Sequence, residues 1–152
     1  IPAGVSTNNY LTMRGQGAAG PRNGGKGDLL LLIEVEEDDR FERQGGHLAT
    51  DLPLSFSQAA LGGTFPVPTP WGEEEVIVPS GTQTATVLRL KGKGLPRLGQ
   101  AGRGDLHIRI NVWTPERLTQ EQERLFRELA EHEGEPPGQG SGFWSRIREA
   151  LG

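Results

Sequence analysis

The stretch AGRGDLHIRINV (residues 101–112) repeats an earlier stretch, GGKGDLLLLIEV (residues 24–35), and this repetition decides the fold. The register continues without a gap from residues 1–35 to residues 78–112, with 12 identities in 35 positions. In the later copy Leu106, Ile108 and Ile110 alternate with polar residues, which is the period of a half-buried strand. Residues 11–14 and 88–91 alternate in the same way, so each copy is predicted to contain two strands joined by a glycine-rich connection.

The first of these connections, RGQGAAGPRNGGKGD (residues 14–28), has the G-x-G-x-x-G and G-x-x-x-x-G-K spacings of phosphate-binding loops. A dinucleotide loop leads into a helix whose N-terminus holds the phosphate, but the segment that follows here is too short and too β-rich for one. Gly20 becomes Arg97 in the second copy, and Gly27 stands where a P-loop needs Ser or Thr. The glycines therefore indicate a strand-to-strand connection, and a nucleotide-binding enzyme is the least favoured alternative.

The repeat also predicts the domain organisation. Residues 1–35 match only the end of the unit that residues 36–114 contain in full, so the chain is expected to begin inside a first domain. The second domain is predicted to contain a strand at 47–55, a helical turn in 56–63, a hairpin turning at 70–72, and strands at 86–91 and 105–113. The predicted fold class is mainly β: two tandem small β-sandwich units, the first incomplete at its N-terminus, followed by C-terminal helices.

The apolar period changes to that of a helix after residue 115. Thr119 and Gln122 fit a capping box, Gly134 fits a C-cap, and Leu118 begins an apolar stripe. Residues 115–134 are predicted to be a helical dimerisation segment, 135–142 a linker and 143–152 a short amphipathic tail that needs a surface to lie on. The residues expected to contact a second protomer are Leu125, Phe126, Leu129, Phe143, Trp144 and Ile147.

The sequence contains no recognisable catalytic or metal-binding motif. It has no cysteine, which excludes disulfides and thiolate metal sites. His47, His107 and His132 are far apart in sequence, so no metal and no other cofactor is expected. Ser55 and Ser57 belong to no nucleophile motif, and the glutamates at 73–75 flank a turn, where a solvated edge is favoured over an acid pair. The chain is therefore predicted not to be an enzyme.

The charge and hydropathy of the chain limit the classes of partner that it is expected to bind. The net charge is −4 and the isoelectric point about 5.4, whereas nucleic-acid binders usually carry a basic face. No window approaches the ~20 apolar residues of a membrane helix, and IPAGVSTNNY (residues 1–10) lacks the pattern of a signal peptide. Neither nucleic acid nor a membrane is expected as a partner, and a cysteine-free chain of this kind suits the cytoplasm.

The two copies differ in one strand. Where the second copy has His107 and Arg109 at outward positions, the first has Leu30 and Leu32, so LLLLI (residues 29–33) is apolar on both faces. One interpretation is that the missing half of the first unit covers that face. The other is a groove that accepts an extended peptide beside a strand edge. The predicted groove residues are Leu29, Leu30, Leu31, Leu32 and Ile33.

Three stretches resemble one known family: RFERQGGHLATDLPLSFSQAALGG (40–63), VPSGTQTATVLRLKGKGLP (78–96) and GRGDLHIRINVWTP (102–115). The chain is similar over nearly its whole length to the C-terminal substrate-binding and dimerisation region of DnaJ-type co-chaperones, the heat-shock proteins of the forty-kilodalton class. The resemblance implies a dimer that binds unfolded clients, prevents their aggregation in the stress response and delivers them to a DnaK-type ATPase chaperone. It also implies that Leu31 lines the client groove.

Two further points qualify the resemblance. The family often has His-Pro shortly before the phenylalanine of RFER, where this chain has Asp38 and Asp39. The J-domain that stimulates the ATPase, and the cysteine-rich zinc module of many members, lie upstream of Ile1 in the family, so this chain is expected to bind clients without stimulating ATP hydrolysis. The alternative from a different class is a structural or adhesive β-sandwich that binds one fixed protein or glycan partner.

Overall fold

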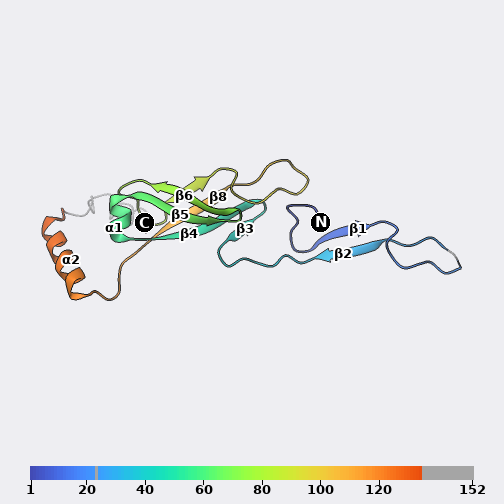
Figure 1. Ribbon diagram of the computed structural model, residues 1–152, viewed down its shortest axis with the longest axis horizontal. Coiled ribbons are helices and arrows are strands. Elements are labelled where there is room, and N and C mark those ends of the chain that lie inside the picture. Colours follow the sequence, from blue (N-terminus) through green and yellow to red (C-terminus); the bar gives the residue numbers. More distant parts are fainter. Residues whose placement is uncertain (23, 135–152) are drawn as a thin grey trace, which may run out of the picture. The chain divides into compact units, whose positions relative to one another are not determined.

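The computed structural model describes residues 1–22 and 24–134, which contain eight strands and two helices (Figure 1). The chain divides into two compact units, residues 1–114 and 115–152, and each is described by itself. The fold is mainly β with a C-terminal helix, as the sequence predicts.

The first copy of the repeat is an antiparallel hairpin. Strand β1 (Asn9–Met13) pairs with β2 (Leu29–Ile33), and Leu11 lies opposite Leu31. The glycine-rich connection folds back on itself, because the Gly17 N–H donates to the Gly27 carbonyl oxygen at 2.7 Å and Ala19 bridges to Lys26. The Asp28 carboxylate closes the base of this connection by accepting from the Gly15 N–H at 2.9 Å.

The second copy has the same strand pairing and the same closing hydrogen bonds. Strands β7 (Val87–Leu90) and β8 (Leu106–Trp113) pair with Leu88 opposite Ile108. The Gly94 N–H donates to the Gly104 carbonyl oxygen at 2.9 Å, and the Gly92 N–H donates to Asp105 at 2.8 Å.

Glycine is required at the first position of both connections, because Gly15 and Gly92 take left-handed φ values of +67° and +72°. A strand follows each connection, not a helix, so neither has the geometry of a phosphate-binding loop.

A four-stranded sheet in the order β3-β4-β8-β7 organises the second copy. Strand β3 (Glu42–Gln44), which the sequence did not reveal, forms a tight hairpin with β4 (His47–Ser55). Strand β4 then pairs in parallel with β8 along its whole length, from Leu48 opposite Leu106 to Ser55 opposite Trp113.

The remaining elements cover one face of this sheet. Helix α1 (Phe56–Leu61) begins at a capping box made by Ser55 and Gln58, and strands β5 (Gly63–Thr69) and β6 (Gly72–Val78) form the predicted hairpin. Side chains from both sheets form one buried core, in which six are almost fully buried: Leu54, Val67, Val78, Leu106, Ile108 and Ile110. This sheet-on-sheet packing agrees with the predicted sandwich.

Three glycines allow the β3–β4 turn to pack against the second connection. A Cβ on Gly104 would lie 2.1 Å from the Gly46 carbonyl oxygen, and one on Gly94 would lie 2.5 Å from the same atom. That oxygen accepts a hydrogen bond from the Leu95 N–H at 2.8 Å. The two loops therefore meet through their backbones, with no room for a side chain between them.

The second unit contains helix α2 (Gln120–His132). Thr119 and Gln122 form both hydrogen bonds of the predicted capping box. The prediction of Gly134 as the C-cap is wrong: Glu133 caps the helix in an extended conformation (φ −69°, ψ 131°), so the exit needs no left-handed residue. Ion pairs of Arg124 with Glu121 and of Arg127 with Glu123 lie along the polar side.

Replacing Gly104 by Ala tests the backbone contact between the loops. We expect Gly104→Ala to lower the free energy of unfolding by about 1–3 kcal/mol, because the new methyl group overlaps the Gly46 carbonyl oxygen. Urea unfolding followed by circular dichroism measures the change. Gly25→Ala is the matched control, since no atom lies within 4 Å of its added Cβ. Equal stability of the two variants would contradict the close approach.

Candidate functional site

The predicted groove strand β2 has two different apolar faces. The register with β1 puts Leu29, Leu31 and Ile33 on one face, beside Leu11 and Met13. It puts Leu30 and Leu32 on the other, with Tyr10. On the second face Leu30 and Leu32 are each 60% exposed, whereas Leu29 and Leu31 are 39% and 37% exposed. The five predicted residues therefore share one strand but divide between two surfaces, and the Leu31 face is the broader apolar one.

The repeat shows what these faces become in a complete unit. The counterparts of Leu29 and Leu31 are Leu106 and Ile108, both 0% exposed beneath the β5–β6 hairpin. The counterparts of Leu30 and Leu32 are His107 and Arg109. Among the described residues of the first copy, nothing equivalent to β4 or to the β5–β6 hairpin covers β2. The Leu31 face thus corresponds to the face of β8 that the complete second copy buries.

On the second copy the outward face is polar and internally paired. The Arg109 guanidinium donates to both Asp51 carboxylate oxygens, at 2.6 and 2.9 Å, and this hydrogen bonding lowers the pKa of Asp51. The pKa of Asp105 is also lowered, first by the hydrogen bond from the Gly92 N–H. Arg109 and His107 occupy the positions that Leu32 and Leu30 hold on β2.

Sequence reasoning placed the histidines far apart, but the fold brings two of them together. His47 and His107 lie on the paired strands β4 and β8 with their ring centroids 5.8 Å apart. The Nδ1 atom of His47 accepts a hydrogen bond from the Asp105 N–H at 3.1 Å, so this imidazole helps to join the start of the two strands. In residues 1–22 and 24–134 no group of three or more metal-ligating side chains is present.

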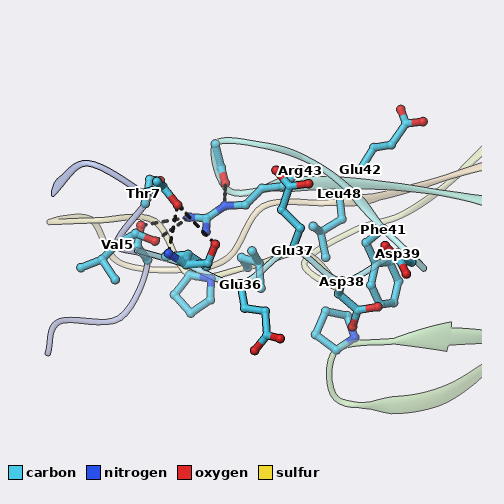
Figure 2. A pocket seen from close by; sticks show the side chains of 17 residues that line it. Val5, Thr7, Glu36, Glu37, Asp38, Asp39, Phe41, Glu42, Arg43 and Leu48 are labelled. Atoms are coloured by element: carbon cyan, nitrogen blue, oxygen red, sulfur yellow. Dashed lines mark hydrogen bonds between the residues drawn. The ribbon is translucent and has the colours of Figure 1, made fainter. Parts of the chain in front are cut away.

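A second site, which sequence reasoning missed, lies where residues 1–7 meet the second copy. Figure 2 shows the Arg43 side chain reaching this segment. Its Nη2 donates to the carbonyl oxygens of Gly4 (3.2 Å) and Val5 (2.9 Å) and to the Ser6 hydroxyl (3.1 Å), while its Nε donates to the Gly45 carbonyl oxygen (2.9 Å). Gly4 in turn lies so close to the 96–98 backbone that a Cβ would fall 2.6 Å from the Leu98 nitrogen.

This junction borders an open cavity of about 870 Å³ (Figure 2). Its apolar lining comes from four parts of the chain: Val5, Val35, Phe41, Leu48, Pro70, Leu95 and Pro96. The segment that enters from β2 adds carboxylates at Glu36, Glu37, Asp38, Asp39 and Glu42. Arg40 donates two side-chain hydrogen bonds to Asp38 and lowers the pKa of that carboxyl to about 2. The signal available in the sequence is the charge run EVEEDDR (34–40), which overlaps RFER (40–43).

The predicted dimer residues fall in two groups. Leu125, Phe126 and Leu129 lie on α2, where they are exposed, and no residue of this helix is buried. The predicted contacts of Phe143, Trp144 and Ile147 lie outside the described residues.

Comparison with known proteins identifies the family. The family model for the DnaJ C terminal domain matches residues 1–115, and its repeated β-units agree with the fold described above. The chain belongs to the DnaJ C-terminal domain family. It is 40% identical over 153 aligned positions to Chaperone protein DnaJ of Acetivibrio thermocellus, and 44% identical over 155 to that of Brevibacillus choshinensis. The protein of the same name from Streptococcus uberis is 42% identical over 153.

These matches cover 99–100% of this chain but only 40–41% of each relative, so the chain spans about two fifths of their length. The relatives are named as chaperones and not as enzymes, which agrees with the prediction that the chain is not an enzyme. Among the described helices, none has the length and apolar character needed to cross a membrane.

The role of Arg43 is open to a direct test. We expect Arg43→Ala to release residues 1–7 from the second copy, because its side chain supplies four hydrogen bonds across or beside the junction. Residual dipolar couplings measure the orientation of β1–β2 relative to β4–β8: one alignment tensor should fit both in the original chain, and two should be needed in the variant. Arg89→Ala, which removes only a 3.9 Å ion pair with Asp105, should leave a single tensor. A single tensor in Arg43→Ala as well would show that Arg43 does not hold the junction.

Proposed function

We propose that this chain is the part of a DnaJ-type co-chaperone that binds unfolded clients and dimerises, and that it delivers clients to a DnaK-type ATPase chaperone. The observation that carries the proposal is that β2 presents leucines on both of its faces, with Leu29 and Leu31 39% and 37% exposed and Leu30 and Leu32 each 60% exposed. Membership of the DnaJ C-terminal domain family supports the same role.

The client groove is assigned to the Leu31 face of β2. Leu29, Leu31, Leu11 and Met13 gather there in register, and in the second copy the equivalent positions accept apolar side chains from a facing sheet. An unfolded client presents the same kind of side chain. Full burial of one leucine contributes about 1.5–3 kcal/mol, so two or three anchors give weak, exchangeable binding once the entropy of ordering the client is subtracted. Weak binding suits a protein that must release its client to another chaperone.

Replacing Leu31 by Ser tests the groove. We expect Leu31→Ser to weaken binding of unrelated apolar peptides by about tenfold or more, because one buried anchor is lost. Fluorescence anisotropy with a peptide library measures the affinities, and circular dichroism checks that the variant is folded. Ile77→Ser is the matched control, since Ile77 is an exposed apolar residue of strand β6.

Unchanged affinities in a folded Leu31→Ser variant would refute the groove assignment. The library also separates a chaperone from the adhesive alternative. A co-chaperone binds many apolar peptides weakly, whereas a dedicated adhesive module binds few of them.

Dimerisation is assigned to the C-terminal segments. The exposed stripe of Leu125, Phe126 and Leu129 on α2 supports this assignment, because a helix with no buried residue gains stability when its apolar side packs on a partner. The tail residues Phe143, Trp144 and Ile147 are proposed to contact the same partner. Whether the helix or the tail contributes more is decided by comparing chains that end at different points.

Three chain lengths test the dimer. Light scattering should give a dimer for residues 1–152 and a monomer for residues 1–114, because the shorter chain lacks every proposed contact. A chain of residues 1–134 separates the contribution of α2 from that of the tail. Within the full chain, Leu125→Glu should weaken the dimer about tenfold or more, while Gln120→Glu, on the polar side of the helix, should not. A dimer that persists in residues 1–114 would refute the assignment.

A further inference from the structure

We propose that the junction cavity is a second peptide site, separate from the β2 groove, which accepts an apolar side chain of a polypeptide flanked by Lys or Arg. Its position alone separates it from the groove, because its lining comes from residues 4–7, 35–39, 41–43, 45, 48, 70 and 95–96 and from none of residues 29–33. Neither the family assignment nor the proposed client groove requires it.

The cavity belongs to the folded architecture. The Arg43 hydrogen bonds and the close approach of Gly4 hold segment 4–7 against the second copy, which fixes one wall. Phe41 packs against the core, Leu48 belongs to it, and both contribute to the apolar floor of the cavity. The volume of about 870 Å³ falls in the range of ligand pockets, about 300–1,000 Å³, so the cavity is large enough for one bulky side chain and adjacent backbone.

The floor and the rim differ in chemistry. Val5, Val35, Phe41, Leu48 and Leu95 form an apolar floor that binds an aliphatic or aromatic side chain through burial. Around it stand the five carboxylates of residues 36–42, and Figure 2 shows Glu36 and Glu42 extending outward in opposite directions.

The rim carries negative charge that its neighbours do not neutralise. Asp38 pairs with Arg40, and the Arg43 guanidinium is occupied by backbone and hydroxyl acceptors. In the described part of the chain, the carboxylates of Glu36, Glu37, Asp39 and Glu42 make no ion pair. Several like charges around an apolar pocket attract a partner that carries cations on both sides of an apolar group.

A polypeptide segment is the occupant that meets both requirements. The carboxylates are spread along seven consecutive positions, so several separate cations are needed to match them, and the floor requires an uncharged side chain between those cations. Acidic segments lack the cations, and the rim repels them. Purely polar segments lack the apolar side chain that the floor requires. The site therefore selects by charge, whereas the β2 groove, which is formed by leucines, does not.

Three synthetic peptides test this proposal with the full chain. One has the core Leu-Leu-Phe-Leu between two pairs of Arg, the second has the same core between pairs of Glu, and the third keeps the Arg pairs around a core of Ser. Fluorescence anisotropy at low salt should show the first peptide binding about tenfold more tightly than either other peptide. Raising the salt to about 300 mM should reduce that preference, because exposed charges are then screened.

Two double variants locate the effect. Glu36→Gln with Glu37→Gln should weaken binding of the first peptide about threefold to tenfold, since both carboxylates line the cavity and their amides keep its shape. Glu73→Gln with Glu75→Gln changes the net charge equally on the exposed side of β6 and should leave binding unchanged. Amide shifts in a ¹⁵N spectrum should move in residues 4–7 and 35–42. Equal losses in the two double variants, or equal binding of the Ser-core peptide, would overturn the proposal.

The Leu31→Ser variant keeps this test distinct from that of the client groove. If both proposals hold, Leu31→Ser retains the preference for Arg-flanked over Glu-flanked peptides while it loses general apolar binding. If the preference disappears in Leu31→Ser, the charged peptide binds at β2 and the junction proposal is wrong. If general binding survives Leu31→Ser but the preference still depends on Glu36 and Glu37, the groove assignment fails and the junction site stands.

Discussion

The parallel pairing of β4 with β8 is the interaction on which the rest of the second copy depends. It joins Leu48 to Leu106 across a long loop of chain, so its entropic cost is offset only when the intervening elements pack as well. Once formed, it aligns the apolar sides of both strands into the floor of the core. It also places Asp51 beside Arg109 and His47 beside His107, and it brings the β3–β4 turn against Gly104, where only backbone fits.

The two copies share a backbone and differ in what their side chains do. The same closing bonds recur at the base of each connection, from the Gly15 N–H to Asp28 and from the Gly92 N–H to Asp105. In the second copy, the apolar face of β8 packs in the core, and its outward face carries Arg109, which pairs with Asp51. In the first, β2 carries leucines at both sets of positions. The scaffold is therefore constant, and the chemistry available to a partner is set by a few substitutions on one strand.

Much of this could be predicted from sequence, and the failures have a common cause. The repeat predicted the paired strands and the role of the glycines, and Thr119 with Gln122 predicted the start of α2, because each of these signals is local. The parallel pairing, the histidine pair and the Arg43 contacts join residues that are far apart in the chain, and no periodicity records them. Strand β3 is only three residues long, which is too short for an alternation to be visible. The prediction of Gly134 as the C-cap failed because a glycine near a helix end marks that end only where the chain turns through a left-handed conformation. Here the chain leaves the helix in an extended conformation at Glu133.

The junction between the copies is held by hydrogen bonds and not by a shared core. Arg43 binds carbonyl and hydroxyl oxygens that water can also satisfy, so each bond contributes only about 0.5–1.5 kcal/mol net, and breaking them exposes little apolar surface. An apolar joint of the same size would hold the two copies more firmly, because separating it would expose apolar surface to water. A polar joint therefore costs less free energy to separate than an apolar one of the same size. It also leaves Phe41, which packs against the edge of the core, accessible from the cavity, beside carboxylates that disfavour unselective apolar binding there.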